Sequence, residues 1–293
     1  MNKPLVGAFL AALLLGAGAA PATAAGPAGH AAEAAPQAEK AATQSPPTTR
    51  AVSFAGTVAL SNCSGSVVRS PLSAPTDPAL VLSNGHCLET GFPGPGEVVV
   101  NRPSTRAFTL LNASGRGVGT LRANKIAYGT MTDTDLSLYE LTSSYRQIED
   151  RYGIRALELD TARPVAGTAI TVASGYWKRT YSCSVDGFAH RLKEGRWTWK
   201  DSVRYTPECR TIGGTSGSPV IDDATGKVVA VNNTGNESGQ RCTDNNPCEV
   251  DENGRVTVRE GINYAQQTYT MVPCIGAGSA IDLNREGCAL PKP

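Results

Sequence analysis

The chain of 293 residues carries 27 lysines and arginines against 26 aspartates and glutamates, which gives a formal net charge of +1. Because no basic or acidic block stands out, the charge pattern gives no sign of binding to nucleic acid or to a charged membrane surface. Beyond the N-terminal segment no apolar stretch is long enough to span a bilayer, so we expect a mature chain that is not held in a membrane.

The N-terminal residues have the pattern of a signal peptide. Lys3 precedes an uncharged apolar run, and the small residues Ala22-Thr23-Ala24 follow it. We therefore expect residues 1–24 to be a signal peptide cleaved near Ala24, which makes the protein secreted and extracellular. A membrane anchor is the alternative, but the run is short, rich in glycine and alanine, and lacks a basic cluster after it.

Residues 25–50 are rich in alanine and proline and can bury little, so we expect a disordered pro-segment or linker. This segment contains His30, and Arg50 at its end is a weak candidate for a processing point. The remaining chain, residues 51–293, is long enough for a sizeable core in one domain or two small ones.

After Arg50 the sequence consists of short segments rich in valine, threonine and isoleucine, separated by glycine, proline, asparagine and serine clusters. This pattern predicts β-strands of about five residues joined by turns. The predicted strand segments are 56–60, 65–70, 79–87, 96–101, 107–112, 168–176, 180–192, 218–222, 227–233 and 255–266. Only residues 144–158 have helical character, interrupted by Gly153, so the sequence favours an all-β sandwich or barrel.

Three further stretches bear on the organisation of the chain. Residues 144–165, which end in ARPVAG, are the best candidate for a connection between two halves. The motif GRGVGT at 115–120 looks like a nucleotide loop, but Thr120 replaces a third glycine and no helix follows, so we expect a hairpin turn. The acidic stretch 244–254 offers oxygen ligands for calcium, yet its spacing does not fit an EF-hand, and a solvated loop is the simpler expectation.

The eight cysteines all lie beyond the predicted signal peptide, at positions 63, 87, 183, 209, 242, 248, 274 and 288. An even count in an exported chain predicts four disulfides. A zinc site needs thiols or imidazoles in close pairs, and the neighbours His86 and Cys87 have no second pair nearby. We therefore expect no metal site.

Two histidines outside the N-terminal segments, His86 and His190, are available as general bases near neutral pH. His86 ends a strand that reads as buried, and it precedes Cys87, so the strand and a disulfide could anchor it at the edge of a cleft. His190, in GFAHRL, has no such anchor, and we expect it on a strand surface.

A serine nucleophile needs a base to accept its proton and a carboxylate to hold that imidazole in the right tautomer. In MTDTDLSLYEL, Asp135 directly precedes an apolar strand and Asp133 lies further from it, so Asp135 is the better candidate. Ser216 lies in GGTSGSPV, residues 213–220, where glycine and proline favour a turn. Alone, each segment also fits an ordinary role, a strand-capping aspartate or a flexible turn.

Taken together, SNGHC, DTDLSL and GGTSGSPV place histidine, aspartate and serine in the order of the chymotrypsin-fold serine peptidases. The region of about 51–290 resembles this family, nearest to its bacterial trypsin-like and glutamyl-endopeptidase-like branches. In these proteins a half-cystine follows the histidine, the aspartate begins an apolar strand, and the serine lies in a Gly-x-Ser-Gly-x-Pro turn. The resemblance implies two six-stranded antiparallel β-barrels, at about 51–145 and about 165–290, with the active site in the cleft between them.

The same resemblance implies roles for individual residues. Ser216 is the nucleophile, His86 the general base and then acid, and Asp135 the carboxylate that orients the imidazole. The backbone amides of Gly214 and Ser216 form the oxyanion hole, where a side chain at 214 would hinder the turn that aims both amides at the developing negative charge. The resemblance suggests the disulfide Cys63–Cys87. Proximity in the sequence adds Cys242–Cys248 and Cys274–Cys288, which leaves Cys183–Cys209 as the fourth pair.

The chain also departs from the family pattern. Members activated by a new N-terminus carry aspartate directly before the nucleophile, whereas this chain has Thr215 there and no IVGG-like start after Arg50, so we do not expect that switch. Arg210 replaces the trypsin-like aspartate six residues before the serine, and Asn232 replaces the glutamyl-specific histidine. Arg210, Thr211 and Asn232 are the candidate substrate-binding residues, and an Arg210 that faced the pocket would favour an acidic side chain.

The sequence therefore predicts a secreted serine endopeptidase that cleaves protein or peptide substrates through an acyl-enzyme intermediate, as a monomer and without a cofactor. Two alternatives use the same scaffold. One is a catalytically silent binding protein, which usually lacks one of the three residues that this chain keeps. The other is an esterase that uses the same histidine, aspartate and serine.

Overall fold

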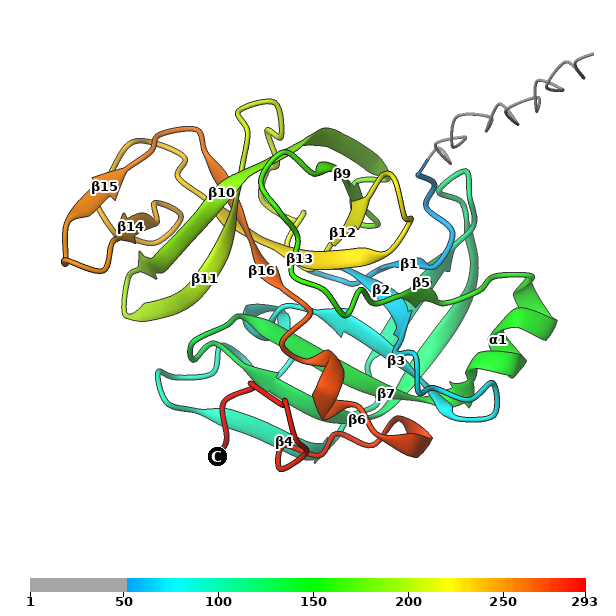
Figure 1. Ribbon diagram of the computed structural model, residues 1–293. Helices are drawn as coiled ribbons and strands as arrows, with labels where there is room; N and C mark the ends of the chain where they lie inside the picture. Colours follow the sequence, from blue (N-terminus) through cyan, green and yellow to red (C-terminus); the bar gives the residue numbers. More distant parts are fainter. Residues whose placement is uncertain (1–51) are drawn as a thin grey trace, which may run out of the picture. The chain divides into compact units, whose positions relative to one another are not determined.

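The computed structural model describes residues 52–293, in which sixteen strands form two β-sheets (Figure 1). The predicted signal peptide 1–24 and the predicted segment 25–50, with His30 and Arg50, lie outside the described residues. None of the helices among residues 52–293 is long and apolar enough to cross a membrane.

The first sheet closes into a six-stranded antiparallel barrel. Its strands follow the order β1, β5, β6, β7, β3, β2, and pairing between β1 and β2 closes the ring. Outside the ring, β4 pairs with β6, and β8 runs parallel to β2. The strands are β1 Thr57–Ala59, β2 Ser64–Arg69, β3 Pro78–Ser83, β4 Val98–Pro103, β5 Ala107–Leu111, β6 Gly117–Thr130, β7 Leu136–Ser144 and β8 Leu157–Glu158.

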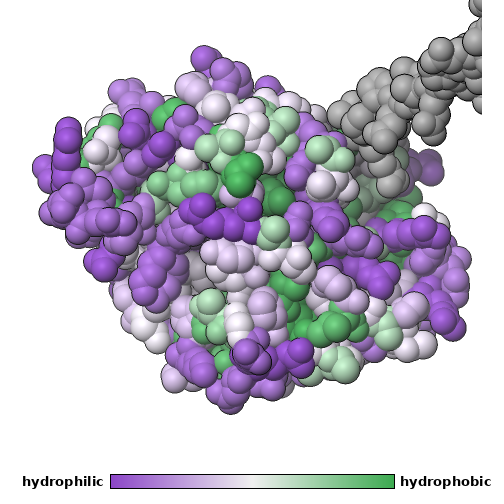
Figure 2. Space-filling view, viewed as in Figure 1, coloured by the Kyte–Doolittle hydropathy of each residue, from purple (hydrophilic) through white to green (hydrophobic). Residues whose placement is uncertain are grey.

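The second sheet also closes into a ring of six antiparallel strands, in the order β11, β16, β13, β12, β9, β10, with pairing between β10 and β11. The hairpin of β14 and β15 extends it beyond β10. The strands are β9 Ala169–Ser174, β10 Arg179–Glu194, β11 Trp197–Tyr205, β12 Pro219–Asp222, β13 Val228–Gly235, β14 Cys248–Val250, β15 Val256–Val258 and β16 Asn263–Gln267. Hydrophilic side chains gather on the visible face where β14 and β15 lie (Figure 2).

The prediction of an all-β, two-barrel fold is confirmed, but four strands were missed: the short β8 and β14 and the long β6 and β11. Strand β6 mixes glycine with arginine, asparagine and lysine, and β11 carries a lysine and an aspartate in its centre, so neither shows the apolar run that marks a strand in sequence. Both form because neighbouring strands on either side satisfy their backbone groups. The motif at 115–120 lies in the turn and first residues of the β5–β6 hairpin, as expected.

The predicted helical segment 144–158 contains a shorter helix, α1, which spans Tyr145–Tyr152. Ser144 begins it with a capping box, in which its side chain accepts from the Gln147 amide and the Gln147 side chain accepts from the Ser144 amide. Gly153 ends it in the left-handed conformation at φ +66°. The helix thus stops at the glycine that interrupts the sequence pattern.

Strand β3 shows how the core positions the loop that follows it. Alternate residues of a strand point to opposite faces. Ala79 and Val81 pack inside the first barrel, while Leu80 and Leu82 pack in a cluster that includes residues of both sheets. All four are fully buried, and burial of each leucine contributes about 1.5–3 kcal/mol. Both faces of β3 are therefore anchored directly before the turn that carries His86.

The end of the chain corrects the predicted extent of the second barrel, which was placed at about 165–290. The last strand, β16, ends at Gln267, and the following residues pack against the first barrel (Figure 1). Met271 and Ile275 are fully buried in the cluster shared by both sheets, and the Tyr128 hydroxyl donates to the Pro291 carbonyl at 3.0 Å. The segment leaves the second barrel because its apolar side chains find their burial on the first.

Candidate active site

One cleft of about 410 Å³ brings together residues from both barrels. His86 and Asp135 line it from the first barrel, and Ser216 lines it from the second. The three residues whose segments drew attention in the sequence therefore lie in one cavity.

His86 is held by Asp135 through two hydrogen bonds. The backbone amide of His86 donates to Asp135 Oδ1 at 3.0 Å, and Nδ1 of the imidazole lies 2.7 Å from Oδ2. Asp135 is fully buried, and its backbone carbonyl accepts from Asn84 Nδ2 at 2.7 Å. With the proton on Nδ1 directed at the carboxylate, Nε2 keeps a lone pair that can accept a proton.

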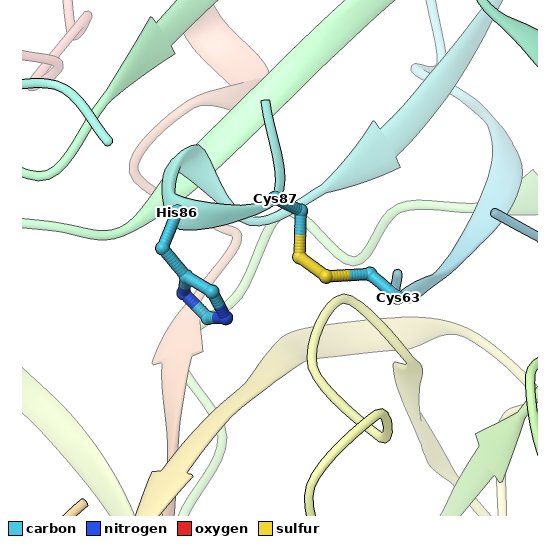
Figure 3. A group of neighbouring side chains, drawn as sticks. All are labelled: Cys63, His86 and Cys87. Carbon is cyan, nitrogen blue, oxygen red and sulfur yellow. A yellow bond between two sulfur atoms is a disulfide. The ribbon is translucent and has the colours of Figure 1, made fainter. Parts of the chain in front are cut away.

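The turn that carries His86 is a short 3₁₀ segment, Gly85–Cys87, directly after β3. Gly85 allows the close approach of the neighbouring strand, since a Cβ there would lie 2.0 Å from the Thr130 carbonyl oxygen. Cys87 is bonded to Cys63, and Figure 3 shows the imidazole and this disulfide projecting from the same turn. The turn is thereby fixed by packing on one side and by a covalent bond on the other.

The charge state of His86 follows from its surroundings. Burial by itself lowers the pKa of the imidazole, but the charge of Asp135 and its hydrogen bond, with a smaller contribution from the charge of Glu194, raise that pKa above its ordinary value. His86 is therefore a stronger base than a free imidazole.

The alternative residues considered in the sequence lie elsewhere. Asp133 is partly exposed and pairs with Lys200 Nζ at 2.6 Å. His190 is exposed on β10, with Nδ1 3.9 Å from Glu252 Oε1, and it does not line the cleft. Asp135 and His86 are thus the aspartate and histidine that meet.

Ser216 reaches the cleft from the turn between the loop after β11 and strand β12. Its Oγ donates to the Asn233 carbonyl at 3.2 Å, and no hydrogen bond to His86 is present among the described residues. The hydroxyl can leave that carbonyl by rotation about its single Cα–Cβ bond. In unliganded enzymes the bond between nucleophile and base is often absent or long.

The backbone around Ser216 leaves the amides of Gly214 and Ser216 without an acceptor. Within residues 52–293 the N–H groups of Gly213, Gly214 and Ser216 make no hydrogen bond, whereas those of Thr215, Gly217 and Ser218 all donate to carbonyls. Gly214 has φ +88°, a conformation that L-residues rarely adopt. Two free donors beside a hydroxyl form the arrangement that can stabilise an oxyanion.

The three candidate substrate-binding residues have different positions. Thr211 and Asn232 line the cleft, whereas Arg210 is exposed and is not part of its lining. Asn232 is nearly fully buried and uses its amide internally: Oδ1 accepts from the Tyr205 hydroxyl at 3.1 Å and Nδ2 donates to Thr215 Oγ1 at 3.1 Å. Asn232 therefore braces the turn, and Arg210 gives no basis for selection of acidic side chains.

Sequence reasoning missed Glu194, a carboxylate that lines the cleft at the end of β10. Glu194 is 9 % exposed, its Oε1 accepts from the Asn245 amide at 2.8 Å, and burial raises its pKa. Glu237 and Asp244 also line the cleft, and no lysine or arginine of residues 52–293 does. In the sequence Glu194 stands between a lysine and a glycine, as in an exposed hairpin, so no local signal marked it.

Four disulfides are present, and they join the pairs named from the sequence: Cys63–Cys87, Cys183–Cys209, Cys242–Cys248 and Cys274–Cys288. Within the described residues, the group with metal-ligand geometry is Cys63, His86 and Cys87. Because the two sulfur atoms are bonded to each other, this group lacks the thiolates that bind zinc.

The sequence profile described as "trypsin-like peptidase domain" matches residues 63–231, more than half of the chain. This range contains the turn of His86, the strand after Asp135 and the turn of Ser216. None of the curated proteins compared with the chain matches it in sequence.

Several solved protease structures are similar to the chain at low identity. The MamO protease domain from Magnetospirillum magneticum is 13% identical over 73% of this chain and 92% of that one, with a TM-score of 0.44. The active form of the Rv3671c protease from M. tuberculosis is 13% identical over 82% and 85%, with a TM-score of 0.47. A Glu endopeptidase is 17% identical over 73% and 85%, with a TM-score of 0.41.

Proposed function

This chain belongs to the trypsin-like peptidase domain family, and from that premise we propose that it is a serine endopeptidase with Ser216 as nucleophile, His86 as general base and Asp135 as orienting carboxylate. The observation that carries the proposal is the buried Asp135 carboxylate, which lies 2.7 Å from Nδ1 of an imidazole in the same cleft as Ser216. A carboxylate in this position fixes the tautomer in which Nε2 accepts the serine proton.

In the proposed reaction, Ser216 Oγ forms a bond to the carbonyl carbon of the scissile peptide while its proton passes to His86 Nε2. The carbonyl oxygen becomes an oxyanion that the amides of Gly214 and Ser216 stabilise. The C–N bond breaks as His86 returns the proton to the leaving amine, which leaves an ester on Ser216. Water, deprotonated by His86, then hydrolyses that ester and regenerates the hydroxyl.

We propose further that the peptidase domain, residues 51–293, is secreted after removal of the signal peptide and acts as a monomer on protein or peptide substrates. Four disulfides support an oxidising compartment. The motif GTSGSPV favours a place near the glutamyl-endopeptidase-like branch of the family. Sequencing the N-terminus of the secreted protein, together with its mass in solution, tests both the processing and the monomer.

The function is tested with an activity-based label. We expect a phosphonyl fluoride to attach to Ser216 of the processed protein and to stop cleavage of denatured protein, whereas Ser216→Ala neither reacts nor cleaves. A folded wild type that neither reacts with the reagent nor hydrolyses peptides or esters would be a silent binding protein. Turnover of esters without turnover of amides would make the protein an esterase.

A further inference from the structure

Each backbone carbonyl of residues 212–216 accepts a hydrogen bond from another group of the protein. The Ile212 carbonyl accepts from the backbone amide of Thr215 at 3.0 Å and from its Oγ1 at 2.5 Å. The Thr215 carbonyl accepts from the amide of Ser218 at 3.1 Å and from its Oγ at 2.6 Å. These bonds are made inside the turn itself.

The other three carbonyls are held by two residues distant in sequence, Ser64 on β2 and Trp177 in the turn between β9 and β10. The Gly214 carbonyl accepts from Ser64 Oγ at 3.3 Å, and the Ser216 carbonyl accepts from the Ser64 amide at 2.8 Å. The Gly213 carbonyl accepts from Nε1 of the Trp177 indole at 2.8 Å. Among residues 52–293, Trp177 is the sole donor to the Gly213 carbonyl.

The Gly213 carbonyl determines where the Gly214 amide points. The two groups belong to one planar peptide, in which C=O and N–H point in opposite directions. Rotation of that peptide between two glycines meets little steric resistance, because neither residue has a Cβ. A rotated peptide would direct a carbonyl oxygen, instead of an N–H, at the developing oxyanion. The orientation of the Gly214 N–H therefore depends on the donor that holds the Gly213 carbonyl.

Trp177 itself is anchored by the β9–β10 hairpin. Its amide donates to Ser174 Oγ at 3.3 Å, and the preceding amide, of Tyr176, donates to Ser64 Oγ at 3.1 Å. Gly175 lies so close to β1 that a Cβ there would be 2.4 Å from the Val58 carbonyl. The indole remains 49 % exposed, so its contact with Gly213 is not a by-product of core packing.

We infer that Trp177 is a positioning residue for the oxyanion hole: its indole N–H holds the Gly213 carbonyl and so keeps the Gly214 N–H, which makes no hydrogen bond within residues 52–293, available to the oxyanion. This inference rests on the proposed function of Ser216. No ion pair reaches residues 212–218 in the described structure, so neutral hydrogen bonds hold the turn. The active orientation is thus set by a half-exposed side chain on a neighbouring hairpin.

The test replaces Trp177 by phenylalanine and, separately, by benzothienylalanine, which keeps the shape of the bicyclic ring and loses the N–H. We expect both variants to lower kcat about tenfold, the scale of one hydrogen bond, with KM changed less than twofold. Affinity for a peptidyl boronic acid, which forms a tetrahedral adduct on the serine, should fall by a similar factor. A merely structural role would leave that affinity unchanged.

Tyr176→Phe is the matched control, because the Tyr176 hydroxyl makes no hydrogen bond within residues 52–293 and the ring is retained. It should keep the wild-type kcat, and the thermal midpoints of all variants should agree within a few degrees. If the wild type is active and both Trp177 variants keep its kcat and its boronate affinity, the inference is wrong and the proposed function stands. If the folded wild type is inactive, both are wrong.

Discussion

The two halves of the candidate site are held by different physical means. On the first barrel, the fully buried Asp135 binds the backbone and the imidazole of His86, and a disulfide fixes the adjacent residue. On the second barrel, uncharged donors hold the backbone of the turn before Ser216, and one of them, Trp177, is half exposed.

This difference follows from what each half has to do. In the proposed reaction the histidine changes its charge, so a buried carboxylate beside it would stabilise the imidazolium as it forms. The turn would present two backbone amides to the oxyanion, and dipoles that are already oriented need no further reorganisation when that charge appears. Changes to the groups around the imidazole should therefore alter the pH profile, and changes to the turn before Ser216 should alter kcat at every pH.

The largest effect is expected from Asp135→Asn. Loss of the carboxylate permits the wrong imidazole tautomer, and we expect kcat to fall about ten-thousandfold, as is typical of serine peptidases with this site. Asp133→Asn is the matched control, since Asp133 is partly exposed and pairs with Lys200, and it should cleave peptides at nearly the wild-type rate. Near-normal activity of Asp135→Asn would exclude Asp135 as the carboxylate that orients His86.

Gly214→Ala tests the backbone of the second half. At φ +88° an alanine is strained, and its Cβ would lie 3.0 Å from Trp177 Nε1 and from Tyr176 Cδ1, so the amide should move. We expect kcat to fall about a hundredfold or more, the cost of losing one oxyanion donor. Gly226→Ala carries a similar backbone penalty at φ +71° with no atom near its Cβ, and it should keep the wild-type kcat.

Thr215→Val tests the internal bonds of the same turn. The substitution removes the hydroxyl that donates to the Ile212 carbonyl and leaves the buried Nδ2 of Asn232 without its acceptor. We expect a loss of about 1–3 kcal/mol in the free energy of unfolding, measured with urea, and a fall in kcat of up to about tenfold. Thr215→Ser retains the hydroxyl and should recover most of the free energy of unfolding and of kcat. Failure to do so would point to packing of the methyl group instead.

The smallest effect is expected from Glu194→Gln, which tests how the charge of a nearby carboxylate affects His86. The proposed mechanism requires a neutral His86, so kcat/KM should fall as the pH drops through the pKa of His86. Because the charge of Glu194 contributes to raising that pKa, its removal should move the acidic limb to lower pH. Trp177→Phe should leave the limb in place, and an unmoved limb in Glu194→Gln would show that this carboxylate is too far away or uncharged.

Glu194→Gln should also change the preference of the protein for the charge of its substrate. The charged lining of the cleft, apart from His86, consists of carboxylates. We therefore expect the wild type to cleave peptides with lysine or arginine near the scissile bond faster than peptides with glutamate there, and the variant to reduce that ratio. A preference for acidic side chains in the wild type would contradict this expectation.

Much of the site could be named from the sequence because its signals are local. Asp135 stands directly before an apolar strand, His86 stands between a buried strand and a cysteine, and glycines surround Ser216. The residues that sequence reasoning missed, Glu194 and Trp177, lie in segments that read as ordinary surface hairpins. Arg210 was weighed as a pocket residue from its spacing to Ser216, and the loop instead leaves it exposed.

The sequence by itself determined the elements whose cause is local: the alternation of short strands and turns, the end of α1 at Gly153, and the glycines that allow the turn at Gly214. Tertiary structure alone decided what meets across the molecule. Ser64 and Trp177 reach the turn before Ser216 from far along the chain, through strand pairing and barrel packing. Such contacts depend on the register and closure of both barrels, and no short stretch of sequence encodes that register.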